Sequence, residues 1–187
     1  MVCHPNGHDR LNCFALVTYI PDPLGKFLDD LRKEIVPGCK PHAHVTILPP
    51  RPISGDVNTA RETVRNLVAE FPPFVIEAAR VELFPVTDVV YIGIGKGEKQ
   101  LRAMHKAMNV GPLEFQEPFD YHPHITIAQE LDSQRAMEMA EYARRRWSEC
   151  AFQQRFQVDT LAFVQSTMNN TWLDLAWAPL RAVATVR

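Results

Sequence analysis

The alternation of apolar and polar residues divides the chain into short strands and amphipathic helices. Runs of β-branched and aromatic residues that end at proline or glycine predict strands, and apolar residues spaced three and four apart predict helices. The predicted strands cover residues 13–20, 44–48, 74–84, 89–94, 124–128, 156–164 and 171–178. The predicted helices cover residues 24–36, 56–71, 98–108 and 131–150, with Asp56 and either Asp132 or Ser133 as N-caps. Polar residues 1–10 are expected to form a loose arm.

The order of these elements repeats. Strand, helix, strand, helix, strand occurs in residues 12–85 and again in residues 88–166, and a final strand follows at 171–178. A period this long indicates a duplicated lobe and not a solenoid unit. By analogy with symmetric dimers, duplicated lobes pack about a pseudo-twofold axis. We therefore expect residues 1–187 to form a single domain of two lobes, with equivalent strands facing each other across a groove.

A short polar motif occurs in the middle strand of each repeat. His44 and Thr46 lie in one apolar strand, and His124 and Thr126 lie 80 residues later in the other. Alternate residues of a strand point to the same face, so each histidine shares a face with its threonine. One such pair is typical of a hydrogen-bonded histidine on a strand. Two pairs at equivalent points of a repeat indicate a functional site.

Two facing imidazoles have a specific chemical use. Because the ordinary pKa of histidine is near 6.5, one ring can be neutral while the other is protonated, which supplies a general base and a general acid together. In-line displacement at phosphorus needs both groups. Each threonine hydroxyl can donate to a nonbridging phosphate oxygen. We expect phosphodiester cleavage or its reversal without a metal or cofactor, and the pattern leaves open which histidine is the base.

These residues resemble the paired signatures of the 2H phosphoesterase superfamily, over about residues 12–180. Within it, the contexts Pro41-His42-Ala43-His44 and Pro123-His124-Ile125-Thr126 are most similar to the bacterial 2'-5' RNA ligase and 2',3'-cyclic nucleotide phosphodiesterase group. The resemblance implies a bilobal α+β fold, in which two antiparallel sheets form a central cleft with helices outside. It also implies that His44, Thr46, His124 and Thr126 are catalytic, and that the substrate is a nucleotide or RNA 3'-end with a 2',3'-cyclic phosphate or a 2'-5' phosphodiester.

One position departs from this pattern. Similar proteins often carry arginine shortly after the second motif, where this chain has Gln129. A neutral amide binds phosphate less strongly than a guanidinium does. Arg51, soon after the first motif, would compensate in part if its side chain turned inward. The departure keeps two other hypotheses open, a noncatalytic nucleotide or RNA-end binding protein and a phosphodiesterase for another small substrate such as ADP-ribose cyclic phosphate.

Residues beside the motifs are candidates for substrate contact. His42, Tyr121, His122 and Gln129 flank the four motif residues. The alternative for the two histidines is a strand-edge position at the mouth of the groove. Four histidines in one groove also suggest zinc, but the threonines and the lack of nearby carboxylates argue against a metal site. Tyr91 is expected in the core, and Tyr121 could either pack there or stack on a base.

Composition limits the possible partners. The formal net charge is -2 and 22% of the residues are charged, so no overall basic field favours duplex DNA. The four cysteines show no paired spacing, and they are expected to be free thiols in a reducing compartment. No apolar run approaches the roughly 18 to 20 residues of a membrane span. A cytoplasmic monomer is therefore the expectation.

Overall fold

The protein is described by a computed structural model that covers residues 9–181, so most of the predicted N-terminal arm lies outside the described residues. The strands in this part of the chain are β1 (Arg10–Tyr19), β2 (His44–Arg51), β3 (Phe74–Leu83), β4 (Val90–Ile94), β5 (His124–Ala128), β6 (Arg155–Val158), β7 (Thr160–Thr167) and β8 (Trp172–Pro179). The helices are α1 (Leu24–Ile35), α2 (Val57–Val68), α3 (Glu98–Met108), the short 3-10 helix η1 (Gly111–Leu113) and α4 (Ser133–Ser148).

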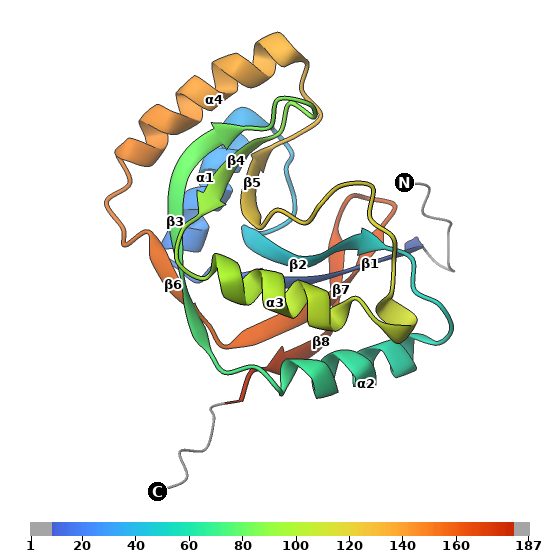
Figure 1. Ribbon diagram of the computed structural model, residues 1–187. Helices are drawn as coiled ribbons and strands as arrows, with labels where there is room; N and C mark the ends of the chain where they lie inside the picture. The colour runs from blue at the N-terminus through green and yellow to red at the C-terminus, as the bar shows by residue number, and fades with distance from the viewer. Residues whose placement is uncertain (1–8, 182–187) are drawn as a thin grey trace, which may run out of the picture.

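The strands form two antiparallel sheets, in the orders β2-β1-β7-β8 and β5-β4-β3-β6. Edge strands β2 and β5 lie against each other where the two sheets meet. Helix α4 runs along the outer side of the second sheet, and α2 lies below the first (Figure 1). The predicted α+β fold, with two antiparallel sheets and helices outside them, is confirmed. None of the helices within residues 9–181 is both long and apolar enough to cross a membrane.

The two sequence repeats exchange elements with each other. Strand β3, from the first repeat, lies in the second sheet, while β7, from the second repeat, lies in the first. The helices cross in the same way, because α1 packs on β5 and α3 packs on β2. Each motif strand is therefore supported by a helix from the other repeat.

The prediction of one strand over residues 156–164 was wrong. The chain forms β6 and β7 there, separated at Asp159, and these strands belong to different sheets. Both strands carry buried apolar residues, so the hydrophobic pattern continues across the break. The predicted end of the first motif strand at Pro49 was also wrong. Because β2 is an edge strand, it tolerates Pro49 and Pro50 and continues to Arg51, with a register shift against β1.

Local sequence signals fix the helix boundaries that position the sheets. The Asp56 carboxylate accepts hydrogen bonds from the backbone N–H groups of Asn58 and Thr59, and Asp132 accepts one from Arg135. Both aspartates are N-caps, as predicted. Gly97 precedes α3 at φ +93°, and a Cβ there would lie 2.8 Å from the Val75 carbonyl oxygen. Only glycine fits this turn without strain.

Candidate active site

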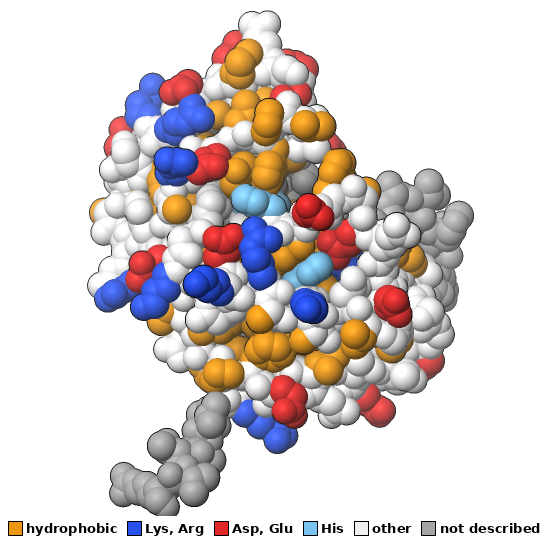
Figure 2. Space-filling model, viewed as in Figure 1, with side chains coloured by type: hydrophobic (Ala, Val, Ile, Leu, Met, Phe, Trp, Pro, Cys, Tyr) orange, Lys and Arg blue, Asp and Glu red, His pale blue; other side chains and the backbone are white. Residues whose placement is uncertain are grey.

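The two His-x-Thr motifs lie on adjoining edge strands with their polar side chains on one face. Val45, Ile47, Ile125 and Ile127 are buried, whereas the four motif residues between them are half-buried. Because of this alternation, the apolar side chains point into the core and the polar side chains point into the cleft between the sheets. Figure 2 shows histidine side chains at the surface in the hollow between the two parts of the molecule. The two predicted motif pairs are thus side by side.

Each motif histidine is held by a hydrogen bond of the same kind. His44 Nδ1 lies 2.6 Å from the carbonyl oxygen of His42, and His124 Nδ1 lies 2.7 Å from that of His122. A carbonyl oxygen can only accept, so Nδ1 carries the proton in both rings. In the neutral ring, the lone pair is then on Nε2. Both imidazoles are therefore in the tautomer that leaves Nε2 free to take or give a proton.

Burial changes the titration of both rings. It lowers the pKa of His44 to about 4, and the positive charges of Arg32 and His124 act in the same direction, while the bond to the His42 carbonyl opposes them. Burial also lowers the pKa of His124, and the nearby charge of His122 adds to this. Both rings are then neutral at pH 7 in the protein alone. This differs from the expected pairing of one neutral and one protonated ring. The spacing of residues in the sequence does not reveal how deeply each ring is buried, and burial is what lowers both pKa values.

Helix α1 holds the segment that precedes the first motif. Arg32 Nη1 donates to the Pro41 carbonyl oxygen at 2.6 Å. Asp29 accepts from the Ala43 backbone N–H at 2.6 Å and lies 2.9 Å from His42 Nδ1. The backbone that presents the His42 carbonyl to the catalytic candidate is fixed in this way by two side chains of one helix.

Helix α3 provides an equivalent support for the second motif. Arg102 donates to the carbonyl oxygen of Tyr121, the residue three before His124, as Pro41 is three before the first motif histidine. Glu98, one turn earlier on α3, holds the same guanidinium. Pro123 has no backbone N–H, so the bond that Asp29 makes has no counterpart in the second repeat. In each repeat, an arginine of the preceding helix thus holds the segment before the motif. The first repeat has one additional hydrogen bond, from the Ala43 backbone N–H to Asp29.

Tyr121 connects the two motifs directly. Its hydroxyl donates to the backbone carbonyl oxygen of Thr46 at 2.7 Å, and its ring stacks on His105 with centroids 4.0 Å apart. His105 Nε2 lies 2.7 Å from a carboxylate oxygen of Glu117. Burial raises the pKa of Tyr121, so the hydroxyl stays protonated and remains a donor. The geometry gives Tyr121 a positioning role, and its predicted contact with substrate stays a prediction.

Arg51 does not turn toward the motifs, so the condition under which it would compensate for Gln129 is not met. Its side chain is 1% exposed and forms an ion pair with Glu117. It also donates to Asn109 Oδ1 at 2.8 Å and to the Pro49 carbonyl oxygen at 2.9 Å. A guanidinium buried this deeply needs several partners, and Arg51 has them in Glu117, Asn109 and the Pro49 carbonyl. Arg51 therefore joins the end of β2 to α3 and the segment after it.

Removing this buried cation should destabilise the fold. We expect Arg51→Met to lower the free energy of unfolding by about 3 kcal/mol, because the buried Glu117 carboxylate loses its cation and keeps only its contact with His105. The double variant Arg51→Met/Glu117→Gln should recover part of the loss. Urea unfolding followed by circular dichroism measures both. Lys26→Met, which breaks the exposed pair with Asp30, is the control, and a loss of the same size there would contradict this account.

Aromatic rings flank both motif histidines, and the sequence reasoning missed most of them. The Trp172 ring of β8 lies 4.6 Å from that of His44. Phe84 and Tyr91 stack on each other at 3.9 Å, and each approaches His124 edge-on at 5.3 and 5.4 Å. Tyr91 is 4% exposed, so its predicted place in the core is confirmed. The exposed Asn169-Asn170 turn just before Trp172 indicates a hairpin in the sequence but does not indicate this contact.

The remaining predicted residues lie at the rim of the cleft. The His42 side chain is 80% exposed and contacts Asp29, while exposed His122 meets the ring edges of Phe84 and Tyr91 at 5.1 and 5.6 Å. Gln129 is exposed immediately after β5. These positions are compatible with substrate contact, which stays a prediction for all three.

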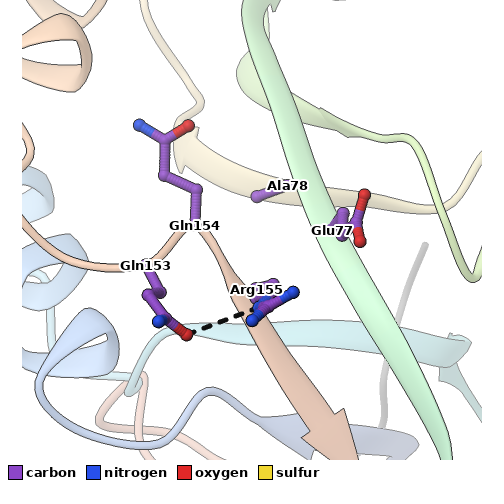
Figure 3. A pocket seen from close by; sticks show the side chains of 5 residues that line it. All are labelled: Glu77, Ala78, Gln153, Gln154 and Arg155. Carbon is purple, nitrogen blue, oxygen red and sulfur yellow. Dashed lines mark hydrogen bonds between the residues drawn. The ribbon is translucent and has the colours of Figure 1, made fainter.

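Other features of the described residues do not form a competing site. Within residues 9–181, no group of three or more histidine, cysteine, aspartate or glutamate side chains could hold a metal ion. Cys13, Cys39 and Cys150 are free thiols in this part of the chain. A hollow at β3 and β6 (Figure 3) is lined by Glu77, Ala78, Gln153, Gln154 and Arg155. It lies on the side of the second sheet away from β5 and contains no aromatic ring, so it does not extend the histidine cleft.

Comparisons with known proteins agree with this fold. The family model described as "2'-5' RNA ligase superfamily" matches residues 20–170. Two bacterial relatives share the name "Putative phosphoesterase". The protein of Oceanobacillus iheyensis is 35% identical over 81 residues, which are 41% of this chain and 47% of that protein, so the match spans about half of its length. The protein of Geobacillus kaustophilus is 21% identical over 85% of this chain and 91% of its own.

Solved structures share the fold at low sequence identity. E. coli LigT in complex with 3'-AMP has a TM-score of 0.62 and 14% identity, and the match covers 92% of this chain and 98% of that one. E. coli LigT in complex with NADP+ has a TM-score of 0.60 and 15% identity, over 92% and 97% of the two chains. The same two-sheet architecture therefore occurs in a protein that has been crystallised with nucleotides.

Proposed function

The chain belongs to the 2'-5' RNA ligase superfamily, and we propose that it is a metal-independent phosphodiesterase of nucleotides or RNA ends. The bond acted on is a 2',3'-cyclic phosphate or a 2'-5' phosphodiester. When the neighbouring ribose hydroxyl replaces water in cleaving a 2'-5' bond, the products are a cyclic phosphate and a free 5'-hydroxyl, and ligation is the reverse of that reaction. One observation carries the proposal. Two histidines on adjoining strands are both fixed through Nδ1–H to a backbone carbonyl, so both Nε2 atoms are available for proton transfer.

The mechanism uses these two atoms in opposite senses. One Nε2 takes a proton from the attacking water as its oxygen bonds to phosphorus. The other Nε2 gives a proton to the ribose oxygen as the P–O bond breaks. Thr46 and Thr126 donate to the nonbridging oxygens, whose negative charge grows in the transition state. Proton transfer and charge stabilisation thus come from side chains alone.

The surroundings of the two rings suggest their roles in hydrolysis. Arg32 lies behind the first motif, and its positive charge favours a neutral His44. His124 is set among the rings of Phe84 and Tyr91, and the arginine that supports its segment, Arg102, is more exposed. We therefore assign His44 as the base and His124 as the acid. A bound phosphodiester anion favours the protonated form of His124 and so prepares it to donate.

A substrate panel with wild-type protein tests the proposal. It contains 2',3'-cyclic AMP, 2'-5'-linked and 3'-5'-linked ApA, and ADP-ribose cyclic phosphate, each assayed with and without EDTA. We expect turnover of at least one of the first two substrates at a rate that EDTA leaves unchanged, and product analysis then reports which ribose oxygen keeps the phosphate. Binding without product would favour the noncatalytic alternative, and activity abolished by EDTA would contradict the metal-independent mechanism.

The pH dependence follows from the two lowered pKa values. Catalysis needs one ring protonated and the other neutral, and in the free enzyme this state is most populated between the two pKa values. We expect a bell-shaped profile of kcat/KM. Its maximum should lie above about pH 4, the pKa of His44, and below pH 6.5, the ordinary histidine pKa, because the pKa of His124 is lower than that ordinary value. Above the maximum, activity falls because the acid loses its proton.

The profile of kcat should peak at higher pH than that of kcat/KM, because the bound anion raises both pKa values. Steady-state rates from pH 3.5 to 9 measure both profiles. A kcat/KM that rises without a maximum through pH 8 would contradict a free enzyme with two low-pKa histidines.

A further inference from the structure

The face of the first sheet that carries His44 continues well beyond the motif. The antiparallel register pairs Tyr19 with His44 and Val17 with Thr46, so these side chains share a face. The floor of this face consists of small buried residues. They are Ala15, Val17, Ala162 and Val164, with Tyr19 and Trp172 packed on them.

This face is curled into a trough. Trp172 lies on β8, the edge strand opposite β2, and yet its ring contacts that of His44. Tyr19 on β1 reaches across β7 to donate its hydroxyl to Asp174 Oδ1 of β8 at 2.7 Å. Both contacts need the two edges of the sheet to bend toward each other. The trough therefore leads from the catalytic cleft along the inside of the sheet.

Two aromatic rings line the far part of the trough. The centroids of Tyr19 and Trp177 are 5.7 Å apart, and Trp177 is 53% exposed. Tyr19 is held in place by Asp174, and burial together with this hydrogen bond raises its pKa. The Trp177 indole is thus accessible to a ligand, and its neighbour Tyr19 is rigidly placed. The pair presents a fixed aromatic platform.

A hollow of about 380 Å³ opens beside this platform. Its lining includes Tyr19, Trp177, Gln157, Asp159 and Thr160. The volume is within the range of small-molecule sites. The Gln157 amide can both donate and accept, as the edge of a base requires, and the Asp159 carboxylate can accept from ribose hydroxyls. Asp159 and Asp174 repel a phosphate group, so the hollow favours an uncharged nucleoside.

We propose that this hollow is a second nucleoside subsite, which binds the nucleoside that stays bonded to phosphorus while the other nucleoside leaves on the His124 side. Tyr19 is the cross-strand partner of His44, so the subsite begins on the neighbouring strand, about 5 Å from the backbone of His44. A cyclic mononucleotide ends at the catalytic pair and does not reach it. The substrate class that fills the cleft is therefore a dinucleoside phosphodiester or an RNA end with a terminal nucleoside. This inference rests on the proposed function for its phosphate position.

Trp177→Ala tests the subsite with two substrates, 2'-5'-linked ApA and 2',3'-cyclic AMP. Stacking of one base on an aromatic ring is worth roughly 1–3 kcal/mol, which corresponds to about 5- to 150-fold. We expect the ratio of kcat/KM for ApA to that for cyclic AMP to fall at least about 10-fold, mainly through KM for ApA. Trp177→Phe should recover most of this ratio. Leu173→Ala, which removes another exposed apolar side chain of β8, should leave the ratio unchanged.

A binding measurement separates this inference from the proposed function. ApA is titrated into a His124→Asn variant and a His124→Asn/Trp177→Ala variant, and binding is followed by tryptophan fluorescence and calorimetry. Weaker binding in the double variant supports the subsite even if the wild type hydrolyses neither substrate, which would overturn only the function. If the wild type hydrolyses both substrates and Trp177→Ala leaves their ratio and the binding unchanged, the subsite is wrong and the function stands.

Discussion

Replacing either motif histidine with alanine should lower kcat at least about 100-fold, because each variant loses one of the two proton transfers. The expectation applies equally to His44→Ala and His124→Ala. The two effects should not add, since the rings act in the same step. Steady-state turnover of the best substrate from the panel measures the loss. Full activity in either variant would overturn the proposed mechanism.

Two controls separate lost chemistry from lost structure. His44→Asn keeps a side-chain N–H that can donate to the His42 carbonyl but has no atom at the place of Nε2, so it should fold normally and remain inactive. His42→Ala removes an exposed ring and keeps the carbonyl that orients His44, so its kcat should fall far less than that of His44→Ala. Circular dichroism and urea unfolding check that all variants are folded.

The assignment of base and acid can be tested with an activated leaving group. Nitrophenolate departs as a stable anion and needs no proton, so a nucleoside nitrophenyl phosphodiester should be cleaved by His124→Ala with a much smaller defect than the natural substrate. His44→Ala lacks the base and should remain impaired on both. The opposite pattern would exchange the two roles.

Removing one threonine hydroxyl should have the next largest effect. We expect Thr46→Val and Thr126→Val each to lower kcat on the order of 100-fold, the lower end of the range for loss of one oxyanion donor. Valine has almost the same shape as threonine, so the packing on the strand is preserved. Thr→Ser at either position keeps the hydroxyl and should recover most of the activity.

A second readout ties the threonines to the phosphate. KM should change less than kcat, since the charge on the nonbridging oxygens grows toward the transition state. An active valine variant beside an impaired serine variant would mean that the methyl group matters and the hydroxyl does not, which would contradict the assigned role.

Much of the architecture could be predicted from the sequence because its signals are local. The period of two in His44-Val45-Thr46-Ile47 sets which side chains enter the core, and this alternation survives in the fold. Asp56 and Asp132 act as caps through hydrogen bonds to residues two or three positions away. Two His-x-Thr motifs at equivalent points of the repeat made it predictable that the two motif strands lie next to each other.

The features that could not be predicted depend on contacts between distant segments. Arg51 pairs with Glu117, and Tyr121 bonds to Thr46, over separations of 66 and 75 residues. Nothing in the neighbouring sequence of either residue indicates its partner. The lowered pKa values of the histidines have the same origin, since they depend on how much of each ring the opposing elements cover. Trp172 reaches His44 only because the sheet curls.

The exchange of elements between the repeats has a mechanical consequence. The chain passes from one sheet to the other between β2 and β3 and returns between β6 and β7, and each motif strand packs on a helix of the opposite repeat. A hinge motion that opened the cleft would have to shear α3 off β2 and α1 off β5 at the same time. The two halves are thus interlocked, and we expect the separation of the histidines to be set by the fold and to change little when substrate binds.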